Sequence, residues 1–410
     1  MLYWKKITER GFFMLIYNLL LLLIIILGVV LCEWKSSRRN DLIFLLLVSA
    51  TMIVISALRA HTVGIDYDMY ATYYKQVHDG GLAFVTSGAN PYRLEIGYSL
   101  LNYVVGLFTP DVRVFMALVS VIMTVLVAVL AYKYSPIPWM TMYIYASFGF
   151  FGNSLSFIRQ SIAIAIFLFA IPYLMKRKFL PYVLILLLAA LFHKSILIML
   201  LAYFVAFLPI NWKSLTVYAV GTGLIMGFSW PILTFVTKYI FKEYATAQGL
   251  YYIVVGRDWN TAAIPVLMAV VAVLLAKPLL RRNPANVVLI NFSIFSALLF
   301  ILTCQRFIFQ RIGTMFFTTA ILLIPELLKS VGVDSDKAEE YEQLKTNLKK
   351  QSSASKRKAY EESRKLKSSL NTHKYVYYYS AGTALFIGFL YSTFILLANR
   401  INLVPYKFFF

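Results

Sequence analysis

Four short polar clusters interrupt an otherwise apolar sequence and hold most of the side chains that could carry chemistry. The first covers residues 59–70 and contains Arg59, His61, Gly64, Asp66, Tyr67, Asp68 and Tyr70. Gly64 permits a tight backbone path beside the acidic residues, and the tyrosines offer aromatic faces with hydroxyl tips. These residues could bind a polar ligand at a membrane surface, or they could form an aromatic belt anchored by an Arg59–Asp66 pair.

The second and third clusters lie where apolar runs begin or end. Arg159 and Gln160 open one run, and an arginine there is costly unless it faces a polar cavity or snorkels to the headgroups. His193 and Lys194 separate two apolar runs, and Ser195 follows directly. Histidine suits proton transfer near neutral pH, although a lone histidine at such a position is also a common interfacial residue.

The fourth cluster adds arginines to the same side of the protein. Arg306 and Arg311 precede an apolar run, and Arg257 lies in the polar segment 238–260. Together with Arg59 and Arg159, at least five guanidinium groups are expected on one face. Guanidinium groups bind phosphate through paired hydrogen bonds, so this set fits a pyrophosphate-linked lipid and a transported soluble anion equally well.

The elements that position these clusters must be membrane helices. Of the 410 residues, 60% are hydrophobic and 14% are charged, and the mean hydropathy is +0.73. Soluble domains hold about 45–50% apolar and about 25% charged residues. The composition excludes a soluble fold, a disordered chain and a disulfide-built secreted domain. The net charge of +21 indicates basic cytoplasmic loops and anionic lipid-linked ligands rather than nucleic acid.

A helix needs about 20 apolar residues to cross the ~30 Å hydrocarbon layer. The run at 179–210 is too long for one crossing, and His193–Lys194 divides it into two. Leu15–Cys32 is followed by no small-residue cleavage site, so we expect a first span rather than a signal peptide. We predict an all-α polytopic membrane protein with about twelve transmembrane helices, at 12–32, 41–58, 112–132, 137–152, 160–175, 179–192, 195–208, 214–236, 261–276, 286–303, 312–328 and 375–397.

The distribution of Lys and Arg predicts the orientation of these spans. The basic clusters at 35–39, 176–178 and 277–282 and the charged segment 329–374 all become cytoplasmic if residues 94–108 form an interfacial or re-entrant helix. Both termini then lie outside, and the cluster of Lys5, Lys6 and Arg10 is discordant. Three parts follow, in chain order: a transmembrane core at 1–328 with outer loops 59–111 and 238–260, a cytoplasmic insertion at 329–374, and a last span with an outer tail at 375–410.

The motifs of nucleotide and metal enzymes are missing from the sequence. It holds no P-loop and no GxGxxG, HExxH, CxxC or GxSxG pattern. Cys32 and Cys304 both lie beside long apolar runs, which argues against a disulfide framework or a zinc cluster. Asp66 and Asp68 alone are a weak metal signal. We therefore expect no cofactor, no metal and no nucleic-acid partner.

Four ordered motifs lie within residues 58–195 of the chain. They are Leu58-Arg59-Ala60 with Gly64-Ile65-Asp66-Tyr67 and Tyr70, then Glu95-Ile96-Gly97-Tyr98, then Phe157-Ile158-Arg159-Gln160-Ser161 with Lys176-Arg177-Lys178, and Phe192-His193-Lys194-Ser195. Weaker matches follow at Gln310-Arg311-Ile312-Gly313 and Val404-Pro405-Tyr406. With this ordered set the chain resembles the EpsG family of Wzy-type polysaccharide polymerases, which serve capsule, exopolysaccharide and O-antigen synthesis. The insertion 329–374 departs from the family pattern.

The resemblance implies a lipid-dependent, all-helical glycosyltransferase similar to the GT-C type, in the bacterial cytoplasmic membrane, without a nucleotide-sugar or metal requirement. Its substrates would be undecaprenyl-diphosphate-linked oligosaccharides, held within the membrane lipid. It would move the growing chain from its carrier onto an incoming repeat unit at the outer face. A chain-length regulator or a flippase of capsule assembly would be its protein partners.

The resemblance also suggests roles for residues. Arg159, Arg311 and Arg59 would stabilise the leaving diphosphate, while His193, Asp66 and Glu95 compete as the general base. Further substrate contacts are expected from His61, Tyr67, Tyr70, Gln160, Arg257 and Arg306. Two other classes stay open: a lipid-linked oligosaccharide flippase or exporter, which needs no base, and a ligase or acyltransferase that acts on cell-surface glycans.

Overall fold

The computed structural model describes residues 14–87, 94–239, 256, 259–332, 335–348 and 353–409. Within these ranges the chain is helical, and it adds one isolated β-bridge between Arg59 and Phe408. The α-helices are α2 (Leu15–Leu27), α3 (Arg38–Ala57), α4 (Tyr67–Thr86), α5 (Ile96–Gly106), α6 (Val112–Tyr134), α7 (Pro138–Ser147), α8 (Phe150–Ser156), α9 (Ile158–Leu168), α10 (Ile171–Met175), α11 (Phe179–Ala190), α12 (Met199–Val205), α13 (Trp212–Tyr239), α15 (Ala263–Leu274), α16 (Ala276–Arg282), α17 (Val287–Gln305), α18 (Ile308–Phe317), α19 (Ala320–Gly332), α20 (Ser335–Leu348) and α21 (Ser353–Ala398). The described part also contains short π-helical or 3₁₀ segments: η1 (Gly28–Glu33), η2 (Lys194–Ile198), η4 (Trp259–Thr261) and η5 (Pro284–Asn286).

Seven helices in the described part are long and apolar enough to cross a membrane. Two bent pairs raise the number to nine: α15 with α16, bent by 68°, and α18 with α19, bent by 41°. The apolar helices at Phe179–Ala190 and Lys194–Val205 are shorter, and α7 and α8 occupy the predicted span 137–152. The chain is thus an all-helical, polytopic membrane protein. The count of about twelve spans stays a prediction.

Two features that the sequence predicted locally are confirmed. The long run at 179–210 breaks where expected, because α11 ends at Ala190 and His193 is extended, with φ −158° and ψ 105°, before η2 begins. Gly64 adopts a positive φ of 97°, and a Cβ there would lie 2.4 Å from the Leu155 carbonyl oxygen. Only glycine fits that close approach, which brings the 59–66 segment against α8.

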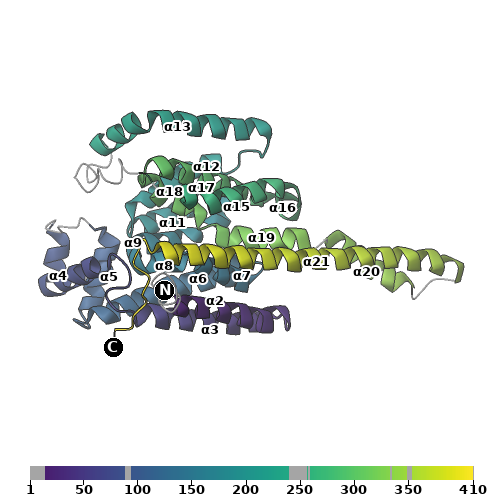
Figure 1. The fold of residues 1–410 in the computed structure, drawn as a ribbon, viewed down its shortest axis with the longest axis horizontal. Helices are drawn as coiled ribbons and strands as arrows, with labels where there is room; N and C mark the ends of the chain where they lie inside the picture. The colour runs from purple at the N-terminus through teal and green to yellow at the C-terminus, as the bar shows by residue number, and fades with distance from the viewer. Residues whose placement is uncertain are drawn as a thin grey trace, which may run out of the picture.

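Side-chain hydrogen bonds tie several helices together near the end of η1. The Glu33 carboxylate accepts hydrogen bonds from Trp139 at 2.9 Å and Tyr377 at 2.6 Å, and Arg38 donates to the Tyr132 carbonyl at 2.8 Å. Figure 1 shows α4 and α5 at the opposite end of the long axis from α20. The predicted cytoplasmic insertion and the predicted outer loop therefore lie far apart, and their assignment to opposite faces of the membrane stays a prediction.

The packing separates a large core from a smaller one. The smaller core lies at the α4–α5 end, where Tyr70, Tyr73, Tyr74 and Tyr98 are each 2% exposed or less and pack on the start of α6 and on Ile158 and Ile162 of α9. These tyrosines are buried between helices rather than spread along a membrane surface. An aromatic belt therefore does not account for them, and they form one wall of the region around Arg159.

Candidate active site

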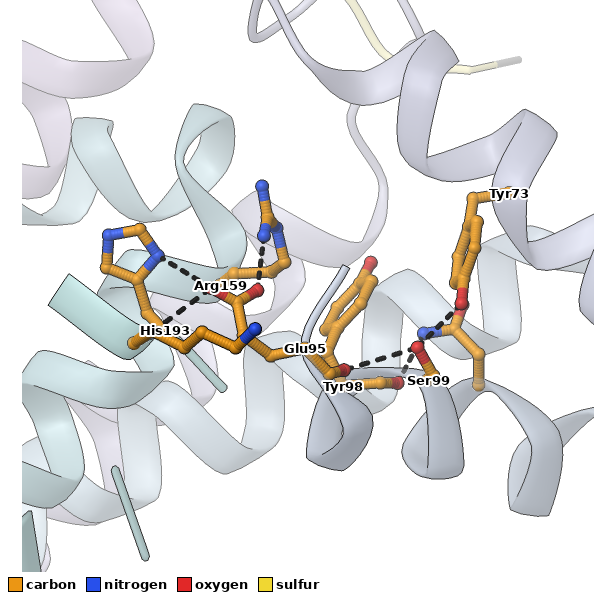
Figure 2. A network of polar contacts seen from close by, with 8 residues as sticks. Tyr73, Glu95, Tyr98, Ser99, Arg159 and His193 are labelled. Atoms are coloured by element: carbon orange, nitrogen blue, oxygen red, sulfur yellow. Dashed lines mark hydrogen bonds and ion pairs between the residues drawn. The ribbon is translucent and has the colours of Figure 1, made fainter. Parts of the chain in front are cut away.

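Glu95 lies at the centre of a buried cluster that joins three separate parts of the chain (Figure 2). The guanidinium of Arg159, in the first turn of α9, forms an ion pair with Oε2 of Glu95. The other carboxylate oxygen, Oε1, accepts a hydrogen bond from the main-chain N–H of Lys194 at 3.1 Å and lies 3.4 Å from Nδ1 of His193. The Glu95 carboxylate is thus contacted by residues that lie 64 to 99 positions further along the chain.

The local backbone explains why these three parts meet. Glu95 caps the start of α5, and two residues later Gly97 donates its N–H to the Leu191 carbonyl at 2.8 Å. A Cβ at position 97 would lie 2.7 Å from that oxygen. Because Gly97 has no side chain, the first turn of α5 sits directly on the break between α11 and η2. That contact carries Glu95 to His193 and Lys194.

The charges in this cluster separate the roles of its two titratable groups. Burial would raise the pKa of Glu95, but the contact with His193, the charge of Arg159 and the N–H of Lys194 outweigh it and lower the pKa to about 2. Burial lowers the pKa of His193 below its usual value of 6.5, which the adjacent Glu95 only partly opposes. At neutral pH the cluster therefore holds an ionised carboxylate and a neutral imidazole, and the imidazole is the group able to accept a proton.

The carboxylate also fixes which nitrogen of His193 is available. A carboxylate beside Nδ1 favours the tautomer that carries the proton on that nitrogen, which leaves Nε2 as an acceptor. The side chain of His193 is 9% exposed, so Nε2 is screened from bulk water. This arrangement of an oriented neutral histidine is typical of general-base sites.

A second hydrogen-bond network extends from the same carboxylate-bearing residue (Figure 2). Tyr73 and Ser99 share a hydrogen bond of 2.6 Å between their hydroxyl groups, and Ser99 donates to the main-chain carbonyl of Glu95 at 3.2 Å. The rings of Tyr70 and Tyr98 pack with centroids 5.4 Å apart. This network ties the start of α5 to α4, and it therefore fixes the position of Glu95 from the side opposite His193.

A cavity of about 180 Å³ begins one residue along α9 from the cluster. Gln160 lines it and donates to the main-chain carbonyl of Arg311 at 2.9 Å. Its polar wall includes Asn153, Gln160, Gln310, Arg311 and Arg400, and its apolar wall includes Ile164, Ala165, Leu168 and Phe307. A cationic wall over an apolar slot suits a ligand with an anionic head and a hydrocarbon chain.

Asp66 and Arg311 connect this cavity with the buried cluster. Burial raises the pKa of Asp66, and the nearby charges of Arg311 and Arg159 oppose that shift. Arg311 also acts on His193, where its charge favours the neutral imidazole. The cavity and the Glu95 cluster therefore belong to one electrostatic environment. Within the described residues, no group of three or more His, Cys, Asp or Glu side chains could hold a metal ion.

Several residues predicted from the sequence lie elsewhere. Arg59 is 3% exposed and donates to the Ser56 carbonyl at 2.6 Å, and its guanidinium stacks over the Tyr67 ring at 5.4 Å. His61 and Asp68 form an exposed pair at 3.2 Å, and Arg306 lies over the Trp230 ring at 5.4 Å. Arg257 lies outside the described residues.

The sequence analysis missed Arg400, which lines the cavity from the far end of the chain. It lies on residues 399–409, which we call the C-terminal strap. The strap crosses the α4–α5 end of the bundle: Gly64 donates to Asn402 at 3.0 Å, Ala60 to Lys407 at 2.8 Å and Ser156 to Ile401 at 3.1 Å. An arginine shortly after the last predicted span was the available signal, because the predicted topology puts it on the same outer side as Arg311.

The comparisons with known proteins identify the family. The sequence model of the EpsG family matches residues 42–338. Neither the curated proteins nor the solved structures contain a match. Because the match covers well over half of the chain, the protein belongs to the EpsG family, and membership indicates a polysaccharide polymerase of the glycosyltransferase kind in the general sense. Glu95, Arg159, His193 and Arg311 fall inside the matched range, and Arg400 falls outside it.

Proposed function

We propose that this EpsG-family protein is a Wzy-type polymerase that joins undecaprenyl-diphosphate-linked oligosaccharide repeat units into a capsular or exopolysaccharide chain. It acts at the outer face of the bacterial cytoplasmic membrane, and it works without a metal. The observation that carries this proposal is an oriented, neutral His193 within reach of the charge of Arg311, which lines the cavity together with Arg400. The imidazole of His193 can accept a proton, and the guanidinium groups of Arg311 and Arg400 can stabilise an anion.

In the proposed reaction, a hydroxyl oxygen of the acceptor sugar attacks the anomeric carbon of the donor. The new glycosidic bond forms as the bond between that carbon and the lipid diphosphate breaks, and the diphosphate leaves with the electron pair. Nε2 of His193 takes the hydroxyl proton, and Glu95 stabilises the imidazolium that forms. Arginines that face the leaving group offset its growing negative charge, which is the largest electrostatic demand of the step.

Arg159 has a double role in this proposal. Its positive charge helps to lower the pKa of Glu95 and so keeps the carboxylate ionised, and it directly precedes Gln160, which lines the cavity. Glu95 is no longer a competitor for the role of base, because a carboxyl group with a pKa of about 2 is a poor proton acceptor at neutral pH. Asp66 stays a candidate for the general base, since burial raises its pKa.

The test is transfer by the purified protein in lipid nanodiscs, with a synthetic lipid-diphosphate repeat unit and product length read on a gel. His193→Ala should lose transfer by about 10²–10⁴-fold, the usual worth of a general base, and bind the donor nearly as the wild type does. His373→Ala, at the other end of the bundle, serves as the matched control. Wild-type transfer by His193→Ala would exclude this mechanism.

The flippase alternative gives a different result in the same preparation. A flippase would move labelled donor across the bilayer of a proteoliposome without lengthening any sugar chain, and it would tolerate His193→Ala. A ligase or acyltransferase would consume donor only when a different acceptor is supplied. Polymer that forms from donor alone therefore separates the proposed function from each of these classes.

A further inference from the structure

Three hollows follow one another from the cationic wall of the cavity, and residues of α21 line the second and the third. The first is the cavity of about 180 Å³ that Arg311 and Arg400 line. The second, of about 100 Å³, shares Asn153, Gln310 and Arg400 with it and adds Tyr391, Phe394 and Ala398 of α21. The third, of about 310 Å³, lies between α15, α19 and α21 and shares Phe148 with the second. Figure 1 shows α19 running alongside α21, with α15 beyond it.

The chemistry of the walls changes along this series. The first two hollows have arginine and carboxamide groups in their walls. The third, which we call the α15–α19–α21 groove, is lined by apolar and hydroxyl-bearing side chains, and none of its wall residues is charged; they are Phe148, Ile264, Leu267, Met268, Val271, Leu275, Ile324, Leu327, Leu328, Val331, Tyr379, Ser380, Thr383, Ala384 and Ile387. One ligand with an anionic head and an apolar chain would match the whole series.

The length of this row of hollows indicates which kind of lipid hydrocarbon chain would fill it. Along α21 it extends from Ala398 to Tyr379, 19 residues of continuous helix, or about 28 Å at 1.5 Å per residue. The hydrocarbon core of a bilayer is ~30 Å thick, so the chains of one leaflet cover only about half of that. A phospholipid whose headgroup lies at Arg400 would end before the groove does, whereas a polyprenyl chain reaches through both leaflets.

The groove is also accessible from the side of the bundle. Leu267 and Tyr379 in its walls are 42% and 77% exposed, and in a membrane that surface faces hydrocarbon. A lipid can therefore enter laterally, without passing through the aqueous phase.

We propose that the α15–α19–α21 groove seats the polyprenyl chain of the donor lipid while its diphosphate lies between Arg311 and Arg400. This inference rests on the proposed function, since it says where the hydrocarbon end of the same donor substrate binds. It makes the enzyme selective for chain length, because a chain too short to reach the groove forgoes the apolar surface that would be buried there.

The experiment compares two donors with the same sugar and diphosphate, one on a geranyl chain and one on an undecaprenyl chain. Ala384→Trp places a large side chain in the groove, and it should raise KM for the undecaprenyl donor by at least ~10-fold, because losing the burial of about two methylene groups is already worth that factor. It should leave KM for the geranyl donor unchanged. Phe386→Trp, on the same helix but 62% exposed, should change neither value. Equal effects on both donors, or none on either, would exclude the groove as the chain seat.

A second readout does not depend on turnover. An undecaprenyl-diphosphate probe with a diazirine near the end of its chain should crosslink to residues 264–275 and 379–387, and Ala384→Trp should prevent this. Excess undecaprenyl diphosphate should compete, and excess phospholipid should not. Crosslinking without polymer formation would keep the groove and reject the proposed function; competition by phospholipid, or labelling elsewhere, would reject the groove.

Discussion

Arg59 and Arg159 start from similar positions in the sequence and end in different surroundings. Each lies at the end of an apolar run, beside polar residues of a family-like motif. In the structure, Nη1 and Nη2 of Arg59 donate to the main-chain carbonyls of Ser56 and Leu155, Nε is buried without a hydrogen-bond partner, and the neighbouring ring is that of Tyr67. Arg159 instead pairs with the Glu95 carboxylate, next to His193 and one residue from the cavity.

The difference shows how the partners of an arginine indicate its role. Main-chain carbonyls are permanent partners, so an arginine that serves them stabilises the fold and has little left for a ligand. A carboxylate that also touches a histidine couples the arginine to a group that can change its protonation state. We therefore infer that the region of Arg59 holds the end of the bundle together, and that the region of Arg159 carries the chemistry.

The largest expected effect is that of Arg159→Ala on transfer. The rate should fall by at least ~10²–10³-fold, the usual worth of one donor to developing charge. The variant should also be less stable, by up to ~3–5 kcal/mol, because it leaves a buried carboxylate without its cation. Adding Glu95→Gln should recover stability but not transfer. Arg159→Lys should recover little, since an ammonium group cannot reproduce the guanidinium fork. Near-normal transfer by Arg159→Ala would mean that Arg159, like Arg59, stabilises the fold and has no part in the chemistry.

The second effect is on the pH dependence of stability. A carboxyl group whose pKa falls from 4.5 to about 2 on folding contributes roughly 3 kcal/mol. That contribution is complete above pH 4.5 and is lost as the pH falls towards 2. Thermal unfolding across this window should show a steep loss for the wild type and for Arg59→Ala, and a flatter one for Glu95→Gln. An unchanged slope in Glu95→Gln would mean that the ion pair is not formed in the membrane.

The third effect belongs to the Arg59 region. Arg59→Ala removes charged hydrogen bonds to buried carbonyls and should cost about 1–3 kcal/mol of stability, seen as a lower Tm in detergent. Transfer per folded molecule should stay close to that of the wild type. If instead the Tm holds and the rate falls, Arg59 contacts the substrate, as the sequence analysis expected.

The smallest effect is expected at the exposed pair of His61 and Asp68, whose side chains are 66% and 76% exposed. Surface ion pairs contribute about 0–1 kcal/mol, so His61→Ala should change both Tm and transfer very little. Because this pair also joins a histidine to a carboxylate, it is a matched comparison for Glu95 and His193. A large loss of transfer would extend the substrate path over the outer surface of α4.

The sequence predicted much of what depends on neighbouring residues. The helical membrane fold, the break at His193 and the tight path at Gly64 follow from apolar runs, an interrupting His-Lys pair and a glycine between charges. The sequence also contained Glu95, Arg159 and His193 as separate candidates, but it could not rank them. Their roles depend on which of them touch, and that is decided by the contact between Gly97 and Leu191, far apart in the chain.

What depends on packing could not be predicted. The tyrosines of 67–74 were compatible with a surface belt and with a ligand site, because local sequence does not reveal that α5 and α6 cover them. The bent pair of α18 and α19 was predicted as the single span 312–328, because a bend of 41° leaves the apolar pattern intact. Arg400 escaped notice because its neighbours in the cavity, Arg311 and Gln160, come from α18 and α9.

The C-terminal strap makes assembly of this site an ordered event. Its residues are synthesised after every helix that they touch, and the bond from Tyr17 to the Leu403 carbonyl joins positions separated by 386 residues. Until the last span has been inserted and the strap has crossed the bundle, the cavity lacks the wall that Arg400 and Ile401 provide. A chain cut before residue 399 would thus keep the Glu95 cluster but lack the part of the cavity wall that Arg400 and Ile401 provide.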